Sequence, residues 1–193
     1  MNEAQIAPSG PRRSAPHLST RPDADEYAPY YGRYLERVPE GDIVRTLEEG
    51  ARESAALLRS EGALARADHA YADGKWTLKE VVGHLTDAER IFSYRLLRFA
   101  RADETPLASF DENAFVPAGQ FAGRSLESLV DEFLAVRNAT LHLVRGVPED
   151  AWTRSGVASG FVMSVRAVAH VIAGHELHHR AIIEQRYLGQ GEA

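Results

Sequence analysis

The stretch SVRAVAHVIAGHELHHRAII, residues 164–183, carries apolar residues at intervals of three and four. This spacing places one apolar stripe along an α-helix. Two positions of the stripe, where leucine or isoleucine is usual, hold His175 and His179. Residues four apart project from the same face of a helix, so both imidazoles should lie on the buried face. The stretch therefore predicts a core helix that brings two histidines together.

Three earlier segments have the same spacing, at about residues 42–60, 77–99 and 125–145. The second opens with Thr77-Leu78-Lys79-Glu80, a capping box that marks a helix start. Gly146 and Pro148 end the third helix, and the last runs from about Ser164 to Gly189. The only strand candidate is 161–163. These patterns predict an all-α fold, an up-down four-helix bundle.

Two kinds of segment lie outside these helices. Residues 1–22 are rich in Pro, Ser, Arg and Ala without periodicity, so we predict a disordered tail followed by one domain over 23–193. Residues 62–74 and 103–124 are predicted loops. The second, between helices two and three, is longer than a bundle needs and holds aromatics and carboxylates, as loops that cover sites often do. The aromatic segment 27–34 is expected on the outside of the bundle.

The composition excludes several classes of protein. The chain of 193 residues is 44% hydrophobic and 26% charged, which is typical of a globular protein with one core. The net charge is −6 and no long basic block occurs, so we expect no nucleic-acid partner. No apolar run has membrane-spanning length and no signal-peptide core follows Met1, so we expect no membrane partner and a cytoplasmic location. Cysteine is absent, which excludes disulfides and a cysteine nucleophile.

Two neutral imidazoles on one helix face can hold a divalent metal, and a third ligand then has to come from another helix. His84, in the run GHLTDAE of residues 83–89, flanks the apolar stripe of the second helix and is the best candidate. Three histidines would leave at least one coordination position open, as in catalytic sites. The alternative is that each histidine is an ordinary core residue with a hydrogen-bond partner.

Neighbouring polar residues could support these ligands from outside. His178 follows His175 by three residues and could face inward, so we predict a supporting or boundary role for it. Asp87 follows His84 by three residues, and support of the ligands and a solvated helix face are equally good interpretations. Glu89 is expected on a solvated face.

The run His175-Glu176-Leu177-His178-His179 also matches H-E-x-x-H, in which Glu176 would be the general base of a zinc protease. Such enzymes need a third ligand downstream, but residues 180–193 contain neither His nor Asp. No sheet edge that could align a peptide is apparent either. We therefore expect Glu176 to be exposed and paired with Arg180, four residues further on.

Three segments together resemble the DinB/YfiT-like family of metalloenzymes: WTLKEVVGHLTDAE at 76–89, FDEN at 110–113 and GHELHHR at 174–180. The resemblance covers the chain from about residue 23. It implies a four-helix bundle with a divalent metal, zinc, nickel or iron, held near one end by His84, His175 and His179. It also implies a homodimer and thiol-dependent chemistry, such as transfer of a low-molecular-weight thiol to an electrophile.

Three functions remain open on these grounds. The first is a metal-dependent enzyme, a thiol S-transferase or a hydrolase, with a small-molecule substrate. The absence of cysteine fits a sulfur nucleophile supplied by a cosubstrate, and it fits water equally well. The second is a metal-binding stress-response module without catalysis. The third is the H-E-x-x-H metalloprotease.

Overall fold

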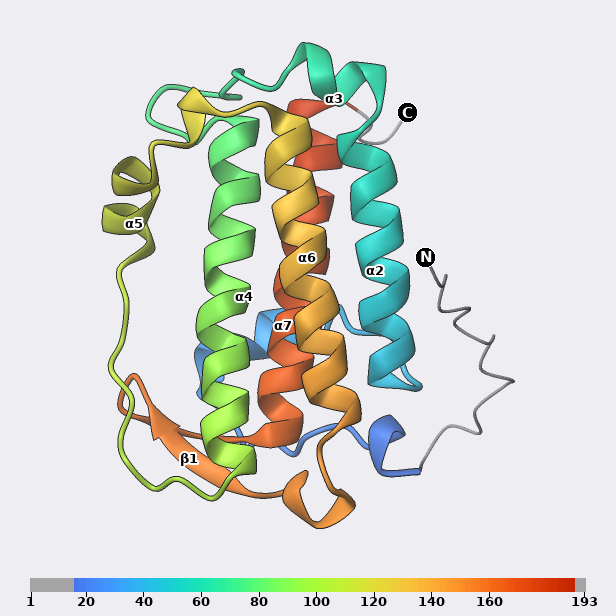
Figure 1. Ribbon diagram of the computed structural model, residues 1–193, viewed down its shortest axis with the longest axis vertical. Helices are drawn as coiled ribbons and strands as arrows, with labels where there is room; N and C mark the ends of the chain where they lie inside the picture. Colours follow the sequence, from blue (N-terminus) through green and yellow to red (C-terminus); the bar gives the residue numbers. More distant parts are fainter. Residues whose placement is uncertain (1–15, 190–193) are drawn as a thin grey trace, which may run out of the picture.

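The computed structural model describes residues 16–189, and four long helices form its central bundle (Figure 1). They are α2 (Ile43–Leu58), α4 (Leu78–Ala100), α6 (Leu126–Arg145) and α7 (Val165–Ile182). Both α2 and α4 pack against α6 and α7, so α2 lies diagonally across the bundle from α4. The predicted all-α four-helix bundle is confirmed, although α4 and α6 do not alternate in direction as the predicted up-down order requires. None of the described helices is long and apolar enough to cross a membrane.

The two central helices in sequence order, α4 and α6, run in the same direction along the bundle, whereas α2 and α7 run the opposite way (Figure 1). Parallel neighbours start at the same end, so the chain has to travel back along the bundle between them. The segment predicted as a loop at 103–124 makes this return. It is not wholly irregular, because it contains α5 (Glu112–Gly119) and the 3₁₀ turn η3 (Phe121–Gly123). The Asp111 carboxylate caps α5 by accepting hydrogen bonds from the Asn113 and Ala114 amides.

A β-hairpin connects α6 to α7 at one end of the bundle. Strand β1 (Ser155–Ala158) pairs antiparallel with β2 (Phe161–Ser164). Only the second strand was expected from the sequence. The turn residues Ser159 and Gly160 have φ values of 55° and 82°, and tight two-residue hairpins require such positive angles. The Ser-Gly pair is thus the local signal for the strand that was missed.

The remaining described segments are short. The chain around the predicted loop at 62–74 includes α3 (Glu61–Ala65), and the N-terminal part contains α1 (Gly32–Leu35) with the turns η1 (Pro16–Ser19) and η2 (Pro29–Tyr31). Residues 16–22, predicted as part of a disordered tail, contact the bundle's N-terminal segment. Arg21 donates hydrogen bonds to the carbonyls of Leu35 and Val38, at 2.6 and 2.8 Å. The disorder predicted for residues 1–15 lies outside the described residues.

The apolar stripes form two core clusters, one at each end of the bundle. The cluster at the hairpin end includes Leu47, Phe99 and Val168, and the other includes Leu78 and Val130; all five are fully buried. On each long helix, polar residues separate the positions that enter the two clusters. The core is therefore interrupted by a polar layer.

An ionic network in this layer joins all four long helices. Arg137 of α6 is 1% exposed and donates to both carboxylate oxygens of Glu89 on α4, at 2.7 and 2.8 Å. It also donates to Glu176 on α7 at 2.7 Å and to the Leu47 carbonyl on α2 at 2.9 Å. The Ser54 hydroxyl donates to the second oxygen of Glu176 at 2.5 Å. Burial opposes the charge of Arg137, but the two carboxylates outweigh it and raise its pKa.

The expectation that Glu89 and Glu176 are exposed was therefore wrong. Their exposed fractions are 4% and 2%, and both carboxylates form ion pairs with Arg137. Arg180, the predicted partner of Glu176, pairs with Glu53 instead, at 2.7 Å. A carboxylate on a single helix is normally assigned to solvent, and only the approach of α6 supplies the buried counter-charge.

The buried His170 makes the stability of the fold sensitive to acid. Its side chain is 2% exposed, and burial is the main reason why its pKa falls from 6.5 to about 4. The unfolded chain therefore binds a proton more readily than the folded protein, and this stabilisation, complete above pH 6.5, is lost as the pH falls towards 4. The shift corresponds to about 3 kcal/mol in the free energy of unfolding. Urea unfolding of the metal-free protein at pH 7, 6, 5 and 4 measures the loss.

The matched variant is His170→Gln, which removes this titration and leaves the other buried histidines in place. We expect its free energy of unfolding to decline less steeply between pH 6.5 and 4 than that of the wild type. Identical declines in the two proteins would contradict the assignment to His170.

Candidate functional site

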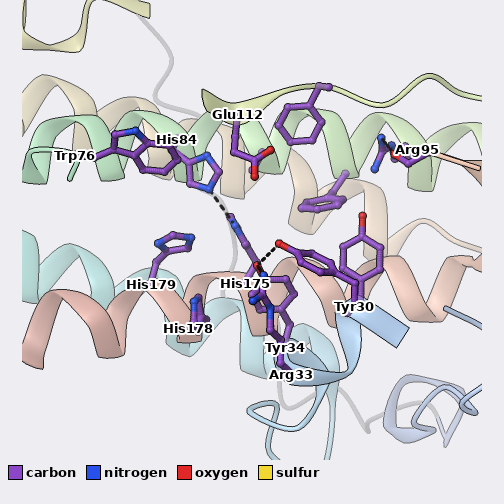
Figure 2. Close-up of a pocket in the computed structure, with 15 residues that line it drawn as sticks. Tyr30, Arg33, Tyr34, Trp76, His84, Arg95, Glu112, His175, His178 and His179 are labelled. Carbon is purple, nitrogen blue, oxygen red and sulfur yellow. Dashed lines mark hydrogen bonds between the residues drawn. The ribbon is translucent and has the colours of Figure 1, made fainter. Parts of the chain in front are cut away.

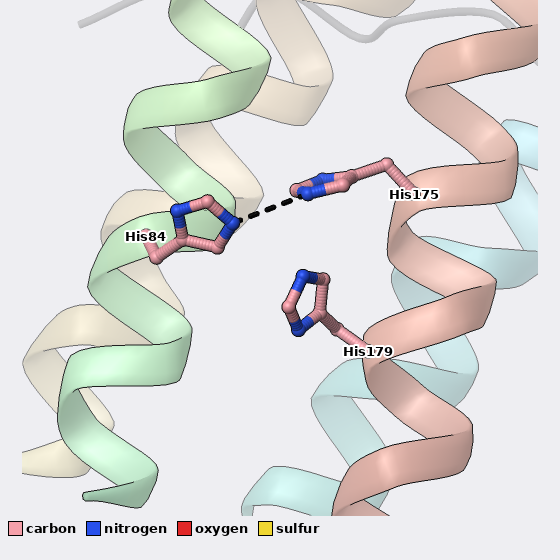
Figure 3. A group of neighbouring side chains, drawn as sticks. All are labelled: His84, His175 and His179. Atoms are coloured by element: carbon pink, nitrogen blue, oxygen red, sulfur yellow. Dashed lines mark hydrogen bonds between the residues drawn. The ribbon is translucent and has the colours of Figure 1, made fainter. Parts of the chain in front are cut away.

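The three predicted ligands come from two helices that pack against each other, α4 and α7. The capping box predicted for α4 is present: the Glu80 amide donates to the Thr77 hydroxyl, and the Thr77 amide donates to the Glu80 carboxylate. This cap fixes the helix start, so that His84 lies about two turns inside it. His175 and His179 lie one turn apart on α7, on the face towards His84 (Figure 3).

The structure brings His84, His175 and His179 into one cluster. One nitrogen from each ring lies within 4.8 Å of the others, and the Nε2 atoms of His84 and His175 are 3.2 Å apart. His84 and His175 are each 7% exposed, and His179 is partly exposed. Within residues 16–189, no other group of three or more histidine, aspartate or glutamate side chains has a geometry that could hold a metal ion.

Burial keeps these imidazoles neutral at physiological pH. It lowers the pKa of His84 to about 4, although the charge of Glu112 opposes the shift. The pKa values of His175 and His179 are lowered well below the usual range, first by burial and then by the neighbouring histidines. Neutral imidazoles have a free lone pair, and metal coordination needs one.

The donor set fits a divalent metal. The Nε2 atoms of His84 and His175 face each other, and in a pair of neutral rings only one of two such atoms can be the donor. A cation placed among the three rings would accept a lone pair from each. Imidazole suits zinc, nickel and iron, the metals implied by the family resemblance.

Aromatic rings hold the histidines in place. Trp76 lies 4.8 Å from the His84 ring, and Tyr34 lies edge-on to His175 at 5.3 Å, measured between ring centroids. Tyr34 can approach because Gly174 precedes His175: a Cβ atom there would lie 2.1 Å from the Tyr34 carbonyl oxygen. The segment 27–34 is therefore only partly on the outside of the bundle, since Tyr34 is 5% exposed.

The cluster opens onto a cavity of about 450 Å³ (Figure 2). Its volume is within the range of small-molecule sites. Glu112, from the crossover between α4 and α6, contributes a carboxylate to the lining, and Arg33 and Arg95 contribute positive charge. The crossover thus forms part of the wall, as predicted for a loop that covers a site.

The sequence interpretation assigned no role to Glu112, Tyr34 or Arg95. Glu112 lies in the FDEN segment and follows the helix cap Asp111, so a local signal for its placement existed. Arg95 comes eleven residues after His84, or three helical turns, and therefore lies on nearly the same face of α4. No comparable spacing signals Tyr34, which reaches the site only because α1 packs on α7.

The two predicted supporting residues have different environments. His178 lines the cavity and lies edge-on to Tyr34 at 5.3 Å, and burial is the first cause that lowers its pKa. Asp87 does not line the cavity; its carboxylate accepts from Arg90 at 3.2 Å instead. Arg90 also donates to Glu132 of α6, so Asp87 belongs to an ion-pair network between α4 and α6 rather than to the cavity lining.

Glu176 is also absent from the cavity lining. Both of its carboxylate oxygens are engaged in the buried network, by Arg137 and Ser54. The general base that an H-E-x-x-H protease requires is therefore directed away from the cluster. The geometry contradicts the protease hypothesis.

Fold and site together define a four-helix bundle with a three-histidine cluster beside a cavity. The chain belongs to the DinB superfamily, whose family model matches residues 12–183, and the predicted family is thereby confirmed. No curated protein sequence matches the chain.

Two solved structures have the same fold. YfiT from Bacillus subtilis, described as a probable metal-dependent hydrolase with an unusual four-helix bundle topology, superimposes with a TM-score of 0.65 at 16% identity. The match covers 91% of this chain and 95% of YfiT. A mycothiol-dependent maleylpyruvate isomerase matches with a TM-score of 0.58 at 18% identity, over 80% of this chain and 60% of the isomerase.

Proposed function

We propose that this protein is a metal-dependent enzyme that acts on a small molecule, as a thiol S-transferase or a hydrolase. One observation carries the proposal: three neutral imidazoles, with ring nitrogens within 4.8 Å of one another, open onto a cavity of about 450 Å³. A structural metal site is usually closed by four protein ligands, whereas this cluster offers three. The cavity gives a fourth ligand and a substrate access to the metal.

Each residue of the site would have a distinct role in this reaction. His84, His175 and His179 would hold a divalent metal, either zinc, nickel or iron. The metal would supply Lewis-acid activation of a thiol or of water, so that an anionic nucleophile exists at neutral pH. Glu112 would accept the proton that this activation releases, because its carboxylate lines the same cavity and its charge acts on His84. Trp76, Tyr34 and Phe92 would keep the rings oriented and limit access of bulk water.

The family supports a metal-dependent reaction without identifying it. One structural neighbour is described as a probable metal-dependent hydrolase, and the other depends on mycothiol. A thiol cosubstrate is also consistent with a chain that has no cysteine of its own. The proposal includes the homodimer and the cytoplasmic location expected from the sequence. Sedimentation velocity tests the dimer.

Turnover is the test of this function. Purified protein loaded with zinc, nickel or iron(II) is incubated with low-molecular-weight thiols and electrophilic or ester substrates, and products are identified by mass spectrometry. We expect product formation that is lost in His179→Ala. Metal binding without turnover on any substrate would favour the non-catalytic module, and a wild type that binds no metal would contradict both.

Replacement of Glu112 by glutamine separates proton transfer from metal binding. The amide cannot accept the proton, so we expect kcat to fall about 100-fold, at the lower end of the range for general-base catalysis. Metal content should remain that of the wild type, because the amide keeps the size of the side chain and the three histidines are unchanged. Asn113→Ala, on the next residue of α5, is the control and should retain kcat. Unchanged kcat in Glu112→Gln would exclude this residue as the base.

A further inference from the structure

Two arginines are almost completely buried in the described part of the chain, Arg95 and Arg137, each 1% exposed. Arg137 is neutralised by two carboxylates, those of Glu89 and Glu176. Arg95 forms no ion pair with any described residue. A buried charge without a counter-charge is strongly unfavourable, so this difference calls for an explanation.

The hydrogen bonds of Arg95 leave part of its guanidinium unused. Nη2 donates to the Ala108 carbonyl at 3.0 Å and to the Ser159 hydroxyl at 2.9 Å, and both acceptors are neutral. Nη1 is buried and meets hydrogen-bond geometry with no partner among residues 16–189. The Tyr31 hydroxyl is nevertheless close enough for Arg95 to lower its pKa, against the larger effect of burial. The rings of Phe92 and Phe110 lie 5.7 and 5.9 Å from the guanidinium carbon and restrict it from the sides.

Arg95 lines the same cavity as the three histidines but lies at its other end (Figure 2). Arg95 follows His84 by eleven positions, which separates their Cα atoms by about 16 Å along α4, and both side chains project from nearly the same face. Tyr31 also lines the cavity, and burial raises the pKa of its hydroxyl, which therefore stays protonated and can donate. The cavity thus has the three histidines at one end and a guanidinium without a counter-charge at the other.

We propose that Arg95 binds a carboxylate of the substrate or thiol cosubstrate, with Tyr31 as a second donor. The ligand class is an extended organic acid whose reactive group reaches the histidines while its carboxylate occupies the free Nη1 position. The placement of the ligand's reactive group at the histidines rests on the proposed function. The placement of its carboxylate rests on Arg95 alone. Hydrogen bonds from a guanidinium to a carboxylate are charge-assisted and stronger than those to the neutral acceptors of Nη2, and Nη1 supplies donors that are not otherwise engaged.

The test compares acids with alcohols of equal length. Isothermal calorimetry on the zinc-loaded protein measures binding of ω-mercaptoalkanoates and ω-mercaptoalkanols of three to eight carbons. We expect the acid to bind at least about tenfold more tightly at the best chain length, as for a hydrogen bond to a charged group. Arg95→Gln should bind acid and alcohol equally and keep the wild-type zinc content. Arg98→Gln, whose native side chain pairs with Asp103 outside the cavity, should retain the preference.

A second pair of probes makes the result independent of the metal. Hexanoate should raise the melting temperature of the metal-free wild type more than hexanol does, and it should lose this advantage in Arg95→Gln. Equal effects of hexanoate and hexanol on the wild type would overturn the inference, and that comparison holds even if Arg95→Gln fails to fold. If hexanoate is preferred while neither thiol binds the zinc-loaded protein, the carboxylate site stands and the thiol-transfer function is contradicted.

Discussion

Arg137→Ala is expected to lower the free energy of unfolding by about 3–5 kcal/mol, more than any other single substitution in the polar layer. The substitution leaves the carboxylates of Glu89 and Glu176 buried and without a counter-charge. It also removes the hydrogen bond to the Leu47 carbonyl, so contacts to three other helices are lost together. Chemical denaturation at pH 7 measures the effect.

Two comparisons distinguish this network from general helix packing. Arg59→Ala removes the exposed ion pair with Asp131, which also joins α2 to α6, and should cost less than about 1 kcal/mol. Arg137→Met combined with Glu89→Met and Glu176→Met removes all three charges at similar volume, and should recover most of the lost stability. A triple variant as unstable as Arg137→Ala would show that packing, and not the unpaired charges, causes the loss.

His84→Ala is expected to weaken zinc binding by more than about 100-fold. Even residues that only orient a metal ligand are worth about 10–100-fold in affinity, and loss of one ligand of three should exceed that. His175 and His179 would remain as a two-nitrogen site on one helix. Competition with a chromophoric chelator measures the affinity, and enzymatic activity should be lost in parallel.

The control for His84→Ala is His142→Ala, which removes an exposed histidine from α6. It should leave zinc affinity unchanged. Equal zinc affinity in His84→Ala and the wild type would exclude His84 as a metal ligand.

The features predicted correctly from the sequence are those with a local signal. The 3-4 spacing in 164–183 predicted α7 with His175 and His179 on one face, and the Thr77–Glu80 capping box fixed the start of α4. His84 could be proposed because it flanks the stripe of the helix that begins at this cap. Periodicity and capping depend on residues within one helix, so a single sequence contains them.

The features that were missed depend on contacts between distant segments. Glu89 and Glu176 are buried only because Arg137 reaches them from α6. The parallel course of α4 and α6 is visible only once the bundle is assembled (Figure 1). Glu112 and Arg95 meet at one cavity although seventeen residues separate them along the chain (112 − 95). The periodicity of a single helix does not predict that these two side chains line the same cavity.

X-ray absorption at the zinc edge of the zinc-loaded protein tests the central claim most directly. We expect three imidazole nitrogens at about 2.0–2.1 Å, together with at least one ligand that does not come from the protein. His84→Ala should reduce the imidazole count. A zinc spectrum with fewer than two imidazoles, or one that is identical in the wild type and His84→Ala, would contradict a metal centre formed by His84, His175 and His179.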